Sequence, residues 1–289
     1  MKNLIYRFRV AIAVFICFWG IALSFMFAGQ LSKIIARVFN LKLDPGFTGG
    51  TVAAVIDDEE NDDAGCGNLV YPQSSKFKQG CLDLVEYTVH QPVYNAIWQT
   101  HKDYWALDMD FASEADDVRN ITVYFGIKNK KENPKLAPLA SSAATLFKGA
   151  ENVSFNKEYP WNFVLWIAGS KGRVFDAGGN FITDVQMNIT DGGRKVQVRI
   201  PLYDKNLQRL YTAEETFHYV LCGAYSDYEE GGFMAIESNA SLSRGSVKNP
   251  EEYNPQIPKV YDVLGSNKYL AAAELMPVSV EMTVSENSK

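Results

Sequence analysis

The chain has few of the residues that most often carry covalent or metal chemistry. Its 289 residues include four cysteines and three histidines. Cys17 lies in an apolar N-terminal run, which leaves three cysteines for the rest, too few for a disulfide scaffold. The histidines, His90, His101 and His218, are far apart and do not have the spacing of a zinc site. Composition therefore excludes a disulfide-rich domain.

Familiar catalytic motifs are missing too. The sequence has no Gly-x-Ser-x-Gly elbow, no His-Glu-x-x-His helix and no Gly-rich phosphate loop that ends in Lys-Ser or Lys-Thr. A haem site would need an axial pair, and His218 with Met234 is the pair to examine. We therefore predict a protein that is not an enzyme.

Basic charge is scarce outside the N-terminus. Residues 1–42 hold six Lys or Arg and no acid, so the remaining 22 basic and 34 acidic residues give the rest a net charge of −12. No basic stripe interleaved with aromatics occurs, which excludes nucleic acid as a partner. The acidic balance suits a protein that binds divalent cations.

A single long apolar run is present, at residues 10–28. These nineteen uncharged residues follow Lys2, Arg7 and Arg9 and are just long enough to cross a bilayer as a helix. Bulky Met26 stands where a signal-peptide cleavage site needs a small residue, which favours an uncleaved signal-anchor over secretion after cleavage. We expect a transmembrane helix and linker over residues 1–43, and an extracellular body over residues 44–289 at the cell membrane.

Export would make four Asn-x-Ser/Thr sequons available for glycosylation. They lie at Asn120, Asn152, Asn188 and Asn239. An occupied asparagine must face solvent, so each predicts a surface position in a glycoprotein of the cell envelope.

The body is predicted to be all-β, an antiparallel β-sandwich. Runs rich in β-branched and aromatic residues are separated by Gly, Asn, Asp and Pro clusters, without long intervening helices. Residues 195–200 alternate polar and apolar side chains, as a half-buried strand does. The predicted strands are residues 118–125, 161–168, 185–189, 195–200, 217–224 and 278–284.

The most informative stretch is acidic and covers residues 58–84. Carboxylates this dense repel one another and cannot be buried unpaired, so a cation or water must neutralise them. Calcium takes six to eight oxygen ligands, and glycines allow the tight turn it needs, although the spacing is not that of an EF-hand. A solvated acidic loop is the alternative. The metal ligands we predict are Asp58, Asp62, Asp63 and Asp83.

The order of residues in this stretch resembles the C-terminal binding module of glucodextranase, which also ends some amylopullulanases. The resemblance rests on the pattern Asp-x-x-x-Asp-Asp-x-Gly-x-Gly, then Tyr-Pro, Phe-x-x-Gly and Asp-Leu, and continues to about residue 276. It implies a jelly-roll-like carbohydrate-binding sandwich. Glu59, Asn61, Cys66 and Leu69 depart from the pattern. Cys66 and Cys81 bracket the motif, and the sequence leaves open whether they form a disulfide or remain free.

Aromatic rings offer a surface for sugars, because they can stack on the C–H faces of a pyranose ring. Trp98 and Trp105 are flanked by polar residues and are the predicted ligand-binding platform, whereas Trp161 and Trp166 are expected in the core. Two functions follow. One is a calcium-stabilised module that binds a polysaccharide or envelope glycan outside the membrane; the other is a structural envelope or filament subunit that self-assembles and binds no free sugar.

Overall fold

The computed structural model describes residues 47–65, 68–93, 103–115, 118–128, 153, 155, 156, 158, 159, 161–225, 232–255, 258–265 and 275–282. The chain divides into two compact units, Met1–Gly49 and Gly50–Lys289. The predicted transmembrane helix and linker, residues 1–43, lie outside the described residues. Within the described part, no helix is both long and apolar enough to cross a membrane.

The second unit is all-β, as predicted. Its only described helical elements are three short 3-10 turns, η1 (Asp191–Gly193), η2 (Leu207–Thr212) and η4 (Pro250–Glu252). The strands are β1 (Val52–Asp57), β2 (Leu69–Val70), β3 (Leu84–His90), β4 (Tyr104–Phe111), β5 (Arg119–Lys128), β6 (Phe163–Ala168), β7 (Lys171–Asp176), β8 (Phe181–Asp184), β9 (Gln186–Thr190), β10 (Lys195–Pro201), β11 (Glu215–Ala224), β12 (Ile236–Glu237), β13 (Gly245–Val247), β14 (Asp262–Val263) and β15 (Val278–Glu281).

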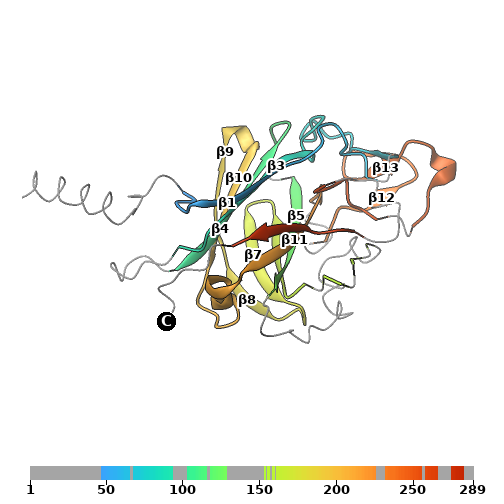
Figure 1. Cartoon of the computed structure of the whole chain (residues 1–289). Helices are drawn as coiled ribbons and strands as arrows, with labels where there is room; N and C mark the ends of the chain where they lie inside the picture. Colours follow the sequence, from blue (N-terminus) through green and yellow to red (C-terminus); the bar gives the residue numbers. More distant parts are fainter. Residues whose placement is uncertain are drawn as a thin grey trace, which may run out of the picture. The chain divides into compact units, whose positions relative to one another are not determined.

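Two sheets form the body. One has five strands in the order β1-β3-β4-β10-β9, and the other has seven, β14-β11-β5-β6-β7-β8 with β15 also paired to β11. Every pair within these two sheets is antiparallel. A small third sheet joins β12, β13 and β2. Figure 1 shows β9, β10, β4, β3 and β1 together, with β5, β11, β7 and β8 in the neighbouring layer.

The two large sheets share one core, because alternate residues of each strand point inward. Leu107 and Val198 from the five-stranded sheet lie in the same buried cluster as Phe125 and Leu165 from the seven-stranded sheet. Trp105 also reaches across, since its ring meets that of Phe125 edge-on at 4.9 Å between centroids. The architecture is therefore the predicted sandwich.

A buried polar contact also joins the sheets. The Tyr87 hydroxyl of β3 lies 2.7 Å from His218 Nδ1 of β11, and Thr216 Oγ1 lies 2.9 Å from His218 Nε2. Burial lowers the pKa of His218 to about 3, so the ring is neutral. Both ring nitrogens are occupied by hydroxyl groups, which excludes the haem ligation considered for His218 with Met234.

Candidate metal centre

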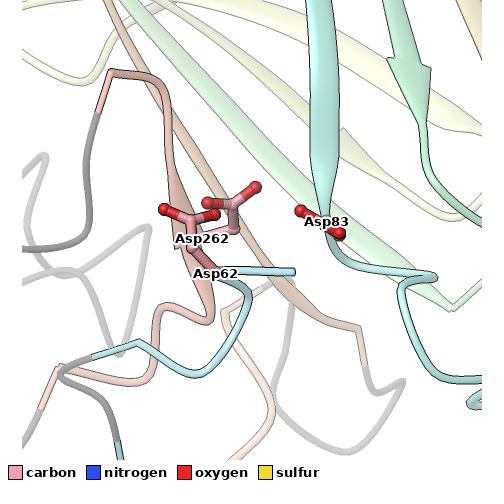
Figure 2. Close-up of side chains that lie close together, drawn as sticks. All are labelled: Asp62, Asp83 and Asp262. Atoms are coloured by element: carbon pink, nitrogen blue, oxygen red, sulfur yellow. The ribbon is translucent and has the colours of Figure 1, made fainter. Parts of the chain in front are cut away.

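Three aspartates from distant parts of the sequence meet at one end of the sandwich. Asp62, Asp83 and Asp262 each contribute a carboxylate oxygen to a group whose members all lie within 4.8 Å of one another. Figure 2 shows the three side chains around one small space, Asp62 on the loop after β1, Asp83 immediately before β3 and Asp262 on β14.

The strand pairing explains why these residues converge. β1 and β3 are antiparallel neighbours, so the end of β1 lies beside the start of β3, and the Asp58 N–H donates to the Val85 carbonyl at 3.0 Å. Asp262 comes from the other sheet, where it is paired with Cys222 of β11. The Leu84 N–H donates to Asp262 Oδ2 at 2.6 Å across the two sheets. The carboxylates therefore lie where both sheets come together.

Local backbone conformations turn the acidic loop toward this point. Asn61 has a φ of 68°, in the left-handed region that asparagine tolerates, and its N–H donates to Asp83 Oδ2 at 2.8 Å. Gly65 has a φ of 57° and donates to the Tyr261 carbonyl at 2.6 Å. A Cβ at position 65 would lie 2.7 Å from the Val260 carbonyl oxygen, so only glycine allows this approach.

The carboxylates are held where their ionised forms are unfavourable. Burial, followed by repulsion from neighbouring aspartates, raises the pKa of Asp58 to about 7 and the pKa values of Asp63 and Asp83 to about 6. Burial also raises the pKa of Asp262 well above its ordinary value, and the charge of Asp58 adds to this effect. A bound cation would offset the cost of burying these carboxylates and their mutual repulsion, because it supplies ligation and opposite charge.

Three carboxylate oxygens lack the partners that buried polar atoms normally have. Within the described residues, Asp58 Oδ2, Asp63 Oδ2 and Asp83 Oδ1 are buried and accept no hydrogen bond. None of these three aspartates forms an ion pair with a lysine, arginine or histidine of the described chain. The Asp83 side chain is completely buried, and Asp63 is 4% exposed. Such oxygens are the groups that a metal ion would satisfy.

The donor set fits calcium. All candidate ligands are oxygens, which hard cations prefer, and calcium–oxygen distances of about 2.3–2.6 Å place two ligands of one ion at most about 5 Å apart. One carboxylate oxygen from each of Asp62, Asp83 and Asp262 lies within 4.8 Å of the other two, which meets this condition. Backbone carbonyls and water could complete the shell.

A buried arginine holds the loops behind the centre. Arg119 is 5% exposed, and its guanidinium donates to the carbonyls of Cys81 at 2.6 Å, Ser113 at 2.9 Å and Gly193. It also stacks on the Phe111 ring, 3.8 Å from the centroid. Burial lowers the pKa of Arg119 to about 10, which leaves it charged at neutral pH. Cys81, whose carbonyl accepts one of these hydrogen bonds, lies two residues before Asp83.

The structure groups the sequence-predicted ligands and adds one. Asp62 and Asp83 are in the triad, while Asp58 and Asp63 affect the same centre through their charges. Asp262 was missing from the predicted set because it lies 178 residues beyond Leu84, to whose N–H it is bonded. A signal was present, since Asp262 is the only charged residue in the run Val260-Tyr261-Asp262-Val263-Leu264.

The predicted sugar platform is wrong at Trp105. This side chain has no exposed surface, and its indole N–H donates to the His90 carbonyl at 2.9 Å inside the sandwich. Strand alternation explains the error, because Trp105 points inward and its neighbour Tyr104 points outward. Trp98 lies outside the described residues. Trp161 is in the core, as expected.

The disulfide alternative is also corrected. Cys81 is a free thiol with no exposed surface, and burial raises its pKa to about 12. The bridge to Cys66 is therefore not formed; Cys66 itself lies outside the described residues. Cys222 is also free and buried, the small core residue that the sequence suggested.

The sequons have different environments. Asn120 is completely buried on β5, which is incompatible with a glycan in the folded protein and corrects that prediction. Asn188 is partly exposed and donates through Nδ2 to Gln197 Oε1 at 2.8 Å. Asn239 is exposed, and Asn152 lies outside the described residues.

Comparison with protein families identifies the chain. Residues 53–277 match the family described as the C-terminal binding module, SLH-like, of glucodextranase. The chain belongs to this family. No curated protein matches it. The match covers both large sheets except β15 and includes all the acidic residues of the candidate centre, and membership indicates a binding role.

Proposed function

We propose that this member of the glucodextranase binding-module family is a non-catalytic, calcium-stabilised module that binds a carbohydrate outside the membrane. The observation that carries the calcium part is the group of buried aspartates between the two sheets. Ligand oxygens would come from the loop after β1 and the residue before β3 on one side and from β14 on the other, so one ion would link both layers of the sandwich.

Calcium is proposed to have a structural role. Asp262 already accepts hydrogen bonds from the N–H groups of Leu84 and Val263, so its carboxylate is oriented before any ion binds. Binding to the folded state alone would stabilise it by about 2.7 kcal/mol at one hundred times the dissociation constant. The ion would thereby hold together the end of the sandwich.

The carbohydrate part rests on family membership, and the external location on the sequence. A nineteen-residue apolar run at residues 10–28 follows basic residues, and Asn239 is a sequon with accessible surface. A module held in this way would capture a polysaccharide or bind the cell's own envelope glycan.

Calorimetric titration of soluble glucans and envelope glycans into the full chain tests the proposal. The protein would be kept in a polyoxyethylene detergent, because detergents with sugar headgroups would compete. Saturable binding in calcium that weakens in chelator is expected. An absence of binding, with calcium still raising the melting temperature, would instead favour the structural subunit and direct attention to concentration-dependent assembly.

The calcium part has its own test. We expect the double variant Asp62→Ala/Asp63→Ala to melt at a lower temperature than the wild type in calcium and at a similar temperature in chelator. Equal losses in both conditions would reject a metal-dependent role for these carboxylates.

A further inference from the structure

The outer face of the five-stranded sheet carries a band of polar side chains, of which Thr88, His90 and Asp108 are buried and the others are partly exposed. Strand alternation turns Trp105 and Leu107 into the core and places Asp108 and Asp110 of β4 on the opposite face. The register then aligns polar residues from neighbouring strands beside them. This outer face, as defined here, comprises Glu86, Thr88 and His90 of β3, Tyr104, Asp108 and Asp110 of β4, Asn188 of β9, and Lys195, Gln197 and Arg199 of β10.

Hydrogen bonds connect the middle of the outer face across three strands. Asn188 Nδ2 donates to Gln197 Oε1 at 2.8 Å, and Gln197 Nε2 lies 3.4 Å from Asp108 Oδ2. Asp108 in turn lies 3.4 Å from His90 Nε2 on β3. Amide, carboxylate and imidazole groups are therefore held in one row by their neighbours, which reduces the entropy lost when a ligand binds.

An aromatic side chain lies further along the same strands, four residues before Asp108 on β4. Tyr104 is partly exposed, and the Arg199 guanidinium lies 4.6 Å from the centroid of its ring. Tyr104 is paired with Pro201, the last residue of β10. Tyr203 follows two residues later and is 51% exposed. The outer face thus combines hydrogen-bonding groups with a partly exposed ring, Tyr104, and the exposed Tyr203 lies just beyond the end of β10.

The charge pattern indicates which ligand this surface suits. Lys195 Nζ lies 2.9 Å from Asp110 Oδ2 and 3.9 Å from Asp108 Oδ2, so positive and negative groups lie side by side. Neither a polyanion nor a polycation would find a matching field here. On edge strand β1 the same face also carries the exposed side chains of Val52 and Val55, which are paired with His90 and Thr88. A neutral polyhydroxylated chain, which can hydrogen-bond to groups of either charge, fits the charge pattern.

We propose that the outer face of the five-stranded sheet binds a neutral glucan, with Tyr203 and Tyr104 stacking on a sugar ring and Gln197, Asn188 and Arg199 bonding its hydroxyl groups. This inference rests on the proposed carbohydrate function and adds the location of the site. It replaces Trp105 by Tyr104, on the opposite side of the same strand, and by residues on and beyond the neighbouring strands.

Two variants and a matched control test the site. Tyr203→Ala removes an exposed ring, and Gln197→Met removes the amide while keeping the length of the side chain. Phe181→Ala is the control, because Phe181 is 54% exposed, lies on β8 of the other sheet and has an arginine, Arg173, 5.9 Å from its ring centroid. Binding of soluble dextran, a starch-type glucan and purified envelope glycan would be titrated with the full chain in calcium.

The outcomes separate this inference from the proposed function. We expect each outer-face variant to bind about tenfold more weakly than the wild type, as residues at the centre of a binding site do, and the control to bind unchanged. All variants should keep the wild-type melting temperature to within about 2 °C, because these positions lie outside the core. Wild-type binding that persists in Tyr203→Ala and Gln197→Met would overturn the location alone. No binding by the wild type to any of the glycans would overturn the carbohydrate function and the location together.

Discussion

Replacing Asp83 by asparagine separates the charge of this carboxylate from its structural contacts. The Asn61 N–H donates to Asp83 Oδ2 at 2.8 Å, and asparagine can place its amide oxygen in that position. The amide NH₂ then takes the place of Oδ1, which accepts no hydrogen bond within the described residues. The variant therefore removes one negative charge from a completely buried position with almost no change in volume.

In chelator, the variant should be at least as stable as the wild type. Burial and repulsion from Asp62 and Glu60 raise the pKa of Asp83 to about 6 from 3.8. Stability is therefore lost as the pH rises through this range, because the unfolded state releases its proton first. The full penalty is at most about 3 kcal/mol, and solvent screening reduces it to about 1–2 kcal/mol. The melting temperature of Asp83→Asn should rise by about 2–8 °C at about pH 7.5.

In calcium, the order reverses. The wild type should gain about 2.7 kcal/mol, or about 5–11 °C, at one hundred times the dissociation constant, whereas the variant has lost a ligand and gains little. Scanning calorimetry of both proteins in chelator and in calcium measures this crossing. Asp184→Asn is the control, because it makes the same charge change at a side chain that is 74% exposed. A loss of equal size for Asp83→Asn in both conditions would refute the reasoning.

Three further substitutions test the frame around the centre. His218→Gln should make the free energy of unfolding less dependent on pH in the acid range. Because the pKa of folded His218 is about 3, the wild type loses stability as the pH falls below about 6.5, by about 1.4 kcal/mol per pH unit. Urea unfolding of both proteins at about pH 7 and about pH 5 measures the difference. Arg119→Met leaves three carbonyls without their donor and should lower the free energy of unfolding by about 3 kcal/mol or more, with Arg119→Lys intermediate. A methionine variant as stable as the wild type in urea would contradict the role of Arg119 in holding these loops. Gly65→Ala adds a Cβ 2.7 Å from the Val260 carbonyl at a φ of 57° and should destabilise by about 1–3 kcal/mol; unchanged thermal unfolding would show that the loop shifts freely.

Strands rich in β-branched and aromatic residues could be found from the sequence, and at residues 195–200 the alternation of polar and apolar side chains gave further support. Residues 195–200 were predicted and β10 is Lys195–Pro201; residues 217–224 were predicted and β11 is Glu215–Ala224. β4 was missed because its first residues follow a polar stretch, which made Trp105 look like a surface residue. Successive side chains of a strand point to opposite faces, so a prediction that is off by one residue exchanges the buried and exposed sets. This is why Trp105 was predicted to be exposed in place of Tyr104.

Contacts between the sheets could not be predicted in the same way. The partner of His218 is Tyr87, 131 residues away in the other sheet, so His218 looked isolated in the sequence. Asp262 was missed for the same reason, because the pairing of β14 with β11 places it beside the acidic loop and no local sequence pattern does so. Local pattern located the acidic half of the centre, and only the sheet topology supplied the other half.

Titration of calcium into the chelator-treated full chain tests the central claim most directly. The proposal predicts saturable binding of one ion to the buried aspartates, and loss of that binding in Asp262→Asn, whose position no local sequence motif connects to the acidic loop. Heats without saturation, or identical isotherms for the wild type and Asp262→Asn, would contradict a calcium centre that joins the two sheets.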